Sequence, residues 1–192
     1  MIRTDRVIDA KGLSCPMPII KTKKAIKEMQ PGTVLEVLAT DKGSTADLKA
    51  WAESSGNQYL GTVEADGTLK HYIRRSGEEE LREKKFPQVV SNDELLTALN
   101  DENVQIIDVR EYAEYAFEHI KGAISIPISD LESKMEQLDK EKAIYVVCRT
   151  GNRSDMACQQ LAAADFPNVK NVVPGMSEWN GPTEKSIEEE TK

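Results

Sequence analysis

Two of the three cysteines stand where a thiol could act as a nucleophile. Cys148 follows the apolar run "AIYVV", and the short loop after it carries Arg149 and Arg153 before a predicted helix. Thiols react as thiolates, and guanidinium groups and a helix N-terminus both favour the ionised form. The stretch therefore predicts a catalytic pocket for negatively charged sulfur and an anionic substrate, with Cys148 as nucleophile and both arginines as catalytic groups.

The residues between the two arginines have the composition of an anion-binding turn. All three, Thr150, Gly151 and Asn152, are expected to bind the substrate, partly through converging backbone N–H groups. Gly151 supplies the backbone freedom for the turn. The spacing is Cys-x4-Arg, one residue shorter than the Cys-x5-Arg loop with which cysteine phosphatases and arsenate reductases enclose a tetrahedral oxyanion. A ring of this size favours a single sulfur.

Cys15 is the second candidate nucleophile. It lies in "GLSCPMP", at or near the N-cap of a helix with Pro16 in its first turn, so the helix dipole again favours a thiolate. Lysines follow at positions 21, 23, 24 and 27 without interleaved aromatic residues. This run is interpreted as a solvated helix face, and no nucleic-acid partner is expected.

The remaining cysteine, Cys158, lies several predicted helical turns after Cys148, beyond the roughly 7 Å Cα separation that a disulfide allows. We expect it to be buried by helix packing, and its role stays open. An odd number of cysteines without CxxC spacing fits a reducing compartment. The two isolated histidines, His71 and His119, predict no metal site.

Composition and charge indicate two units. The chain has 192 residues, 39% of them hydrophobic, with no apolar run of membrane-spanning length and no signal-peptide core, so we expect a cytoplasmic protein without a membrane partner. Residues 1–75 carry 12 Lys+Arg and 9 Asp+Glu, a net of +3, whereas residues 76–192 carry 13 and 24, a net of −11. The two parts of the chain therefore differ in sign.

These observations predict one domain at residues 1–75 and another at residues 88–182. The connecting residues 76–87, "SGEEELREKKFP", are charged and end in proline, which predicts an extended and mobile linker. Residues 183–192 predict a disordered acidic tail.

The first unit is expected to be an α/β two-layer sandwich with the element order βαβαββ. The predicted strands are "DRVID", "TVLEVLAT", "NQYLGTVE" and "TLKHYIRR". One helix follows Cys15, and another begins at Ser44, which forms a candidate capping box with Asp47. Residues 65–67, Ala-Asp-Gly, indicate a hairpin.

The second unit alternates strands and helices. Predicted strands are "VQIIDV", "AIYVV" and "NVKNVV", and helices are expected after Ser91 and from Ser154. This order predicts an α/β/α domain with a central parallel sheet covered on both faces. Ligands bind such sheets beyond the carboxyl ends of the strands, which is where Cys148 is expected.

The loop "CRTGNRS" resembles the active-site loop of single-domain rhodaneses, and "DVREYAEYAFEHIKGAISIP" resembles their Asp-Val-Arg and Gly-His-Ile-x-Gly-Ala signatures. The resemblance covers about residues 86–182. It implies a persulfide on Cys148 and an Asp108–Arg110 pair that supports the active-site loop. The chain departs from the pattern at Glu118, where the family usually has glycine, and at Pro174, where a second glycine is common.

The stretch "GLSCPMP", followed by "TKKAIKEM" and "LEVLATDKGS", resembles the TusA/SirA family of sulfur carriers over residues 5–75. In that family the cysteine of Cys-Pro-x-Pro holds a persulfide. The resemblance therefore implies that Cys15 is a carrier thiol and a second catalytic cysteine.

Together, the resemblances imply a sulfurtransferase of the thiosulfate sulfurtransferase type. Cys148 would take sulfane sulfur from thiosulfate or a low-molecular-weight persulfide and exchange it with Cys15, which would deliver it to a downstream acceptor protein. Cysteine persulfides would be the intermediates, and neither a cofactor nor a metal is expected. Two alternatives are clearance of reactive persulfides and a regulatory or binding role that signals sulfur status. The donor, the final acceptor, the direction of transfer and the oligomeric state are left open.

Overall fold

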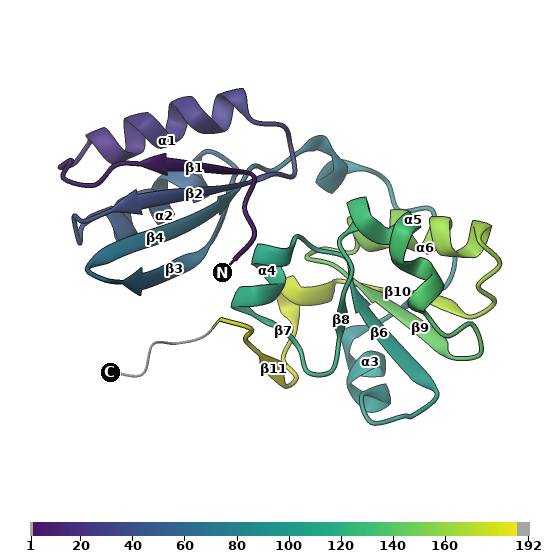
Figure 1. The fold of residues 1–192 in the computed structure, drawn as a ribbon. Helices are drawn as coiled ribbons and strands as arrows, with labels where there is room; N and C mark the ends of the chain where they lie inside the picture. The colour runs from purple at the N-terminus through teal and green to yellow at the C-terminus, as the bar shows by residue number, and fades with distance from the viewer. Residues whose placement is uncertain (1, 188–192) are drawn as a thin grey trace. The chain divides into compact units, whose positions relative to one another are not determined.

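The computed structural model describes residues 2–187, which form two compact units. One unit comprises the residues up to Glu78, and the other comprises Glu79–Ser186. Each unit has its own sheet and its own core (Figure 1). Within the described residues, none of the helices combines the length and the apolar character that crossing a membrane requires.

The N-terminal unit has the predicted βαβαββ order. Its elements are β1 (Arg6–Asp9), α1 (Met17–Glu28), β2 (Val34–Ala39), α2 (Ser44–Ser54), β3 (Gln58–Ala65) and β4 (Thr68–Arg74). The strand order in the sheet is β1-β2-β4-β3, with β1 parallel to β2 and the other neighbours antiparallel. The prediction of a two-layer sandwich is confirmed.

Hydrophobic periodicity explains why both helices pack on one face of this sheet. Leu35 and Val37 alternate along β2 and lie in one core cluster with Ile26 of α1 and Leu48 of α2. The apolar residues therefore recur every second position in β2 and at helical spacing in α1 and α2. Both patterns point their apolar side chains into the same core between the sheet and the helices. The predicted hairpin is also confirmed, because Asp66 and Gly67 adopt the positive φ angles of a tight turn between β3 and β4.

The expected capping box at Ser44 does not form. Helix α2 has Gly43 at its N-cap and no side-chain cap, and Ser44 instead contacts Nε2 of His71 at 2.9 Å. The other ring nitrogen, Nδ1, lies 2.9 Å from the hydroxyl oxygens of Tyr59 and Thr62. His71 is fully buried, and this burial lowers its pKa from 6.5 to about 4. Ser44 is therefore engaged by a neutral core histidine.

The C-terminal unit alternates strands and helices around a parallel sheet (Figure 1). Its main elements are β5 (Val89–Val90), α3 (Asn92–Ala98), β6 (Val104–Asp108), α4 (Tyr112–Phe117), β7 (His119–Ile120), β8 (Ile124–Ser125), α5 (Leu131–Lys134), β9 (Ala143–Val147), α6 (Asn152–Ala163), β10 (Val169–Val172) and β11 (Thr183–Glu184). Short 3-10 turns lie at Glu78–Leu81, Ile128–Asp130, Met135–Gln137 and Gly175–Glu178. The large sheet has the order β5-β10-β9-β6-β8, and all its pairings are parallel. The α/β/α prediction is confirmed.

Two clusters of buried side chains flank this sheet. One contains Leu161 of α6 and Leu131 of α5, whereas the other contains Leu95 of α3 and Ile120 of β7. The sheet is thus covered on both faces, as the continuous apolar strands require. Because β6 and β9 are parallel neighbours, their carboxyl ends bring Asp108 and Cys148 to the same edge.

Both flanks of this domain are more structured than the sequence predicts. Residues 76–87 were expected to be mobile, but the C-terminal unit begins at Glu79 and the backbone N–H groups of Lys85 and Phe86 donate to Asp155 at 2.9 and 2.8 Å. Residues 183 and 184, predicted as part of the disordered tail, are ordered, because Thr183–Glu184 pairs with β7 as strand β11. Residues 188–192 of that tail lie outside the described residues.

We predict that the N-terminal unit loses stability as the pH falls from about 6.5 to about 4. In this window the unfolded chain protonates His71 whereas the folded chain does not, so protons bind preferentially to the unfolded state. Urea unfolding followed by Trp51 fluorescence in a Trp179→Phe background measures this change. A His71→Gln chain should show a shallower pH dependence, and an equal slope in both chains would contradict the assignment.

Candidate active site

Cys148 follows β9 directly and is only 1% exposed. The backbone N–H of Gly151 donates to its Sγ at 3.1 Å, and the Ser154 hydroxyl oxygen lies 3.3 Å from Sγ, within hydrogen-bond distance. Gly151 is the N-cap of α6, so the sulfur also faces the positive end of that helix. Two hydrogen-bond donors and the N-terminus of α6 thus surround the sulfur.

One buried asparagine organises both groups that contact this sulfur. The Asn171 amide on β10 accepts from the Ser154 hydroxyl at 2.6 Å and donates to the Gly151 carbonyl at 3.0 Å. Gly151 has φ +90°, and a Cβ there would lie 2.8 Å from the Val173 side chain. The turn at Gly151 therefore requires glycine both for its backbone angle and for its close packing.

The outer side of the loop is held by the segment that follows β10. Met176 N–H donates to the Cys148 carbonyl, and Ser177 N–H donates to the Arg149 carbonyl, each at 2.9 Å. Gly175, at φ +80°, permits this approach, because a Cβ on it would lie 2.4 Å from the Cys148 carbonyl oxygen. Pro174, which departs from the rhodanese pattern, precedes this glycine and leaves the contact intact.

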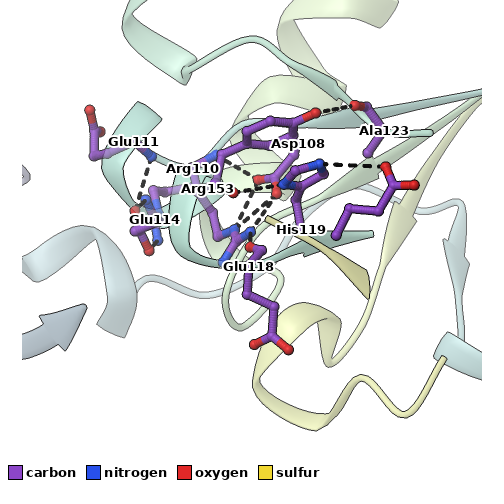
Figure 2. Close-up of polar contacts among 10 residues, drawn as sticks. Asp108, Arg110, Glu111, Glu114, Glu118, His119, Ala123 and Arg153 are labelled. Atoms are coloured by element: carbon purple, nitrogen blue, oxygen red, sulfur yellow. Dashed lines mark hydrogen bonds and ion pairs between the residues drawn. The ribbon is translucent and has the colours of Figure 1, made fainter. Parts of the chain in front are cut away.

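The Arg153 guanidinium, which was expected to bind an anion, is paired with a carboxylate of the same unit (Figure 2). It forms a two-pronged ion pair with Glu114 of α4, with N···O distances of 2.6 and 2.9 Å, and both side chains are buried. Burial acts to lower the pKa of Arg153, but Glu114 and, more weakly, Cys148 outweigh it and raise the pKa. Arg153 is therefore a permanent buried cation that acts on Cys148 through its field.

Asp108 and Arg110 form a second buried ion pair beside the first (Figure 2). Arg110 Nη2 donates to Asp108 Oδ2 at 2.6 Å and to the Glu118 carbonyl at 2.7 Å. This fixes the end of β6 to the junction between α4 and β7. Burial opposes the charge of Arg110, whereas Asp108 and then Glu114 raise its pKa. The support of the Cys148 loop expected from Asp108 and Arg110 stays a prediction, because these hydrogen bonds join the pair to Glu118.

The remaining predicted loop residues differ in placement. Arg149 and Thr150 are half-buried in the turn after Cys148, whereas Asn152 is buried and its Nδ2 donates to the Arg82 carbonyl at 3.0 Å. Cys158 lies in the same core cluster as Cys148, and burial raises its pKa strongly. The prediction that Cys158 is buried by helix packing is confirmed.

Cys15 lies in a different environment. It is exposed and precedes Pro16, the N-cap of α1, and the Asp47 carboxylate of α2 acts on its thiol. Interaction with Asp47 is the main cause that raises the pKa of Cys15, and desolvation and the charge of Asp41 add to it. The expectation of a helix-stabilised thiolate at Cys15 is therefore wrong, because carboxylates from another element favour the protonated thiol.

Sequence reasoning missed several residues that shape the Cys148 site. They are Glu114, Ser154, Asn171 and Gly175, which come from four separate segments. Only Ser154 is next to a predicted catalytic residue. The stretch "EYAEYAF" gives no sign of the ion pair, because the positions three and four residues from Glu114 are Arg110, Glu111, Phe117 and Glu118, which are mostly charged.

Comparison with known proteins assigns each unit to a described type. The family model "Sulfurtransferase TusA" matches residues 6–75, and the model "Rhodanese-like domain" matches residues 91–182. The "Putative sulfur carrier protein YrkF" of Bacillus subtilis is 46% identical over 185 residues, which cover 96% of this chain and 100% of that protein. One relative therefore shares the whole two-unit organisation.

Further matches concern single units. "Sulfur carrier protein TusA" of Allochromatium vinosum is 42% identical over 72 residues, which cover 38% of this chain and 95% of that protein. A crystal structure of a rhodanese-like domain protein from Staphylococcus aureus is 30% identical, covers 53% of this chain and 100% of that chain, and has a TM-score of 0.48.

Replacing Glu114 by glutamine is predicted to lower the unfolding free energy of the C-terminal unit by about 3–5 kcal/mol, because Arg153 then remains buried without a counter-charge. Guanidinium unfolding followed by Trp179 fluorescence measures the loss. Glu118→Gln, on an exposed side chain nearby, is the matched control and should change stability by less than about 0.5 kcal/mol. The double change Glu114→Leu with Arg153→Met should recover much of the loss, and equal midpoints for Glu114→Gln and the wild type would refute the role of the pair.

Replacing Asp47 by asparagine is predicted to increase the alkylation rate of Cys15 by iodoacetamide several-fold at pH 8. The change removes the negative charge that raises the pKa of Cys15, so more thiolate is present at a given pH. Mass mapping of the Cys15 peptide gives the rate. Asp66→Asn removes the same charge at the β3–β4 turn and should have no effect. Equal rates in both variants would count against Asp47.

Proposed function

Because this chain belongs to the family of sulfur carrier proteins in which a TusA domain precedes a rhodanese-like domain, and so acts in sulfur transfer, we propose a two-cysteine relay. Cys148 takes the sulfane sulfur of thiosulfate and passes it to Cys15. Cys15 then delivers it to a downstream acceptor protein. The relay is a series of thiol–disulfide-type exchanges and uses cysteine persulfides without a metal or cofactor.

The observation that carries the proposal is the environment of the Cys148 sulfur. It faces the N–H of Gly151 at 3.1 Å and the hydroxyl of Ser154 at 3.3 Å, with the buried cation of Arg153 nearby. These groups stabilise a thiolate before reaction and an anionic persulfide after it. Arg149, in the half-buried part of the turn, adds positive charge for an incoming anion.

In the first step the Cys148 thiolate attacks the outer sulfur of thiosulfate. A new S–S bond forms to Cys148 while the S–S bond of thiosulfate breaks, and sulfite leaves with the electron pair. The product is the Cys148 persulfide. No oxidant is consumed, because the transferred sulfur atom was already at the sulfane level in the donor.

In the second step the Cys15 thiolate attacks the terminal sulfur of the protonated Cys148 persulfide. The Cys15 persulfide forms, and Cys148 leaves as a thiolate with the electron pair of the broken S–S bond. The Gly151 N–H and the Ser154 hydroxyl stabilise this leaving group. Thiols that leave as stabilised thiolates leave faster, so the same contacts assist both steps.

The surroundings of Cys15 favour this direction of transfer. Asp47 and Asp41 place negative charge beside the exposed Cys15 thiol. A small dianion such as thiosulfate is repelled there, whereas the positive groups around Cys148 attract it. We therefore assign loading from an anionic donor to Cys148 and the carrier role to Cys15.

The test follows added sulfur mass on the two cysteine-containing peptides after incubation with thiosulfate. In the Cys15→Ser chain, Cys148 should gain one sulfur and retain it until an acceptor is added. In the Cys148→Ser chain, Cys15 should remain unlabelled, because its only proposed source of sulfur has been removed. Labelling of Cys15 at the wild-type rate in Cys148→Ser would overturn the relay, and labelling by an alkyl persulfide but not by thiosulfate would overturn the assigned donor.

A further inference from the structure

The segment before β5 is attached to the loop that holds Cys148. Asp155, in the first turn of α6, is 3% exposed, and its Oδ1 accepts from the N–H groups of Lys85 and Phe86. Its other oxygen, Oδ2, accepts from Gln159 at 2.7 Å. The buried carboxylate of Asp155 on α6 thus binds the backbone of the connecting segment.

Three further contacts reinforce this attachment. Phe86 is buried in the core cluster that also contains Cys148. Asn152 donates to the Arg82 carbonyl at 3.0 Å. Lys84 lies against the turn, since its Cε would be 2.9 Å from a Cβ on Gly151.

We name residues 82–86 the strap. These contacts of the strap are all with residues 151–155 or with the core cluster that contains Cys148. The turn at Gly151 and the Ser154 hydroxyl belong to the same stretch and contact the Cys148 sulfur. The strap therefore fixes the end of the interdomain connection at the base of the catalytic loop. Glu79 as the first residue of the C-terminal unit agrees with this division.

We propose that the strap is a positioning element that anchors the tether of the carrier domain beside Cys148 and so makes Cys15 of the same chain the preferred sulfur acceptor. This inference rests on the relay proposed above. At most residues 76–81, which include the 3-10 turn Glu78–Leu81, then connect the N-terminal unit to the strap, in place of the twelve residues 76–87 that the sequence suggests.

The expected size of the effect follows from chain statistics. A flexible segment of twelve residues has an r.m.s. span of about 20 Å, and one of six residues has a span of about 13 Å. Where both lengths can reach the site, effective concentration falls with about the −3/2 power of length, so doubling the free tether lowers it about threefold. Releasing the strap should therefore lower the preference for the same chain's Cys15 about threefold.

Two variants alter the free tether in independent ways. Asp155→Ala removes the acceptor of both strap N–H groups, and Asp155→Asn is its matched control, because the amide oxygen can still accept them. Insertion of six Gly-Ser residues after Gly77 lengthens the tether and leaves α6 and the strap unchanged. The insertion decides the question if Asp155→Ala does not fold.

Each chain is loaded with thiosulfate in the presence of an equal concentration of isotope-labelled Cys148→Ser chains as competing acceptors. The readout is the ratio of sulfur on Cys15 of the loaded chain to sulfur on Cys15 of the labelled chain at short times. This ratio does not depend on how fast Cys148 is loaded. Hydrogen exchange at the Lys85 and Phe86 amides reports separately whether the strap is released.

The expected result is that Asp155→Ala exposes both amides to exchange and, like the insertion, lowers the ratio about threefold, whereas Asp155→Asn does neither. An unchanged ratio in a chain with freely exchanging strap amides, or in the insertion chain, would overturn the anchoring role. Sulfur that stays on Cys148 and reaches Cys15 in neither kind of chain would overturn the relay itself, and with it this inference. The two failures are therefore distinguishable.

Discussion

The proposed chemistry depends on the side-chain amide of Asn171. Its oxygen and nitrogen hold Ser154 and Gly151, the two residues that contact the Cys148 sulfur. The Ser154 hydroxyl has one hydrogen, which can go to Asn171 or to sulfur. When Cys148 is a thiol, its own hydrogen can satisfy Ser154, and when it is a thiolate the hydroxyl can turn towards it. The amide thus supports both protonation states without movement of the backbone.

Buried charge provides the second constraint on the loop. Arg153 and Arg110 each have a carboxylate partner, Glu114 and Asp108, and all four side chains are buried between α4, α6 and the end of β6 (Figure 2). Separating either pair would cost free energy, because each ion would then be a buried charge without a counter-ion. The Arg153–Glu114 pair therefore joins the first turn of α6, which follows the catalytic loop, to α4, and the field of Arg153 reaches sulfur without requiring the guanidinium to bind substrate.

Prediction from the sequence succeeded where local patterns decide the outcome and failed where distant segments meet. The order of helices and strands along the chain, the two-layer and three-layer architectures and the burial of Cys158 follow from periodicity and spacing. The partner of Arg153 could not be predicted, because Glu114 lies 39 positions away and pairs only after α4 and α6 pack. The carboxylate at Cys15 escaped notice for the same reason, since Asp47 belongs to a different helix. The position of Cys15 at a helix end predicts a lowered pKa, whereas its interaction with Asp47 raises the pKa.

The two thiols therefore have opposite environments that suit opposite tasks. Cys148 is buried among donors and positive charge, which favours reaction with an anion and protects the sulfur from bulk solvent. Cys15 is exposed, and Asp47 raises its pKa, which lowers the thiolate fraction and with it the reactivity towards other electrophiles. A carrier must present its sulfur to another protein, so it cannot gain selectivity by burial. Suppressing the thiolate is a means by which an exposed thiol remains selective, and attachment of the tether beside Cys148 supplies the proximity that offsets the resulting loss of rate.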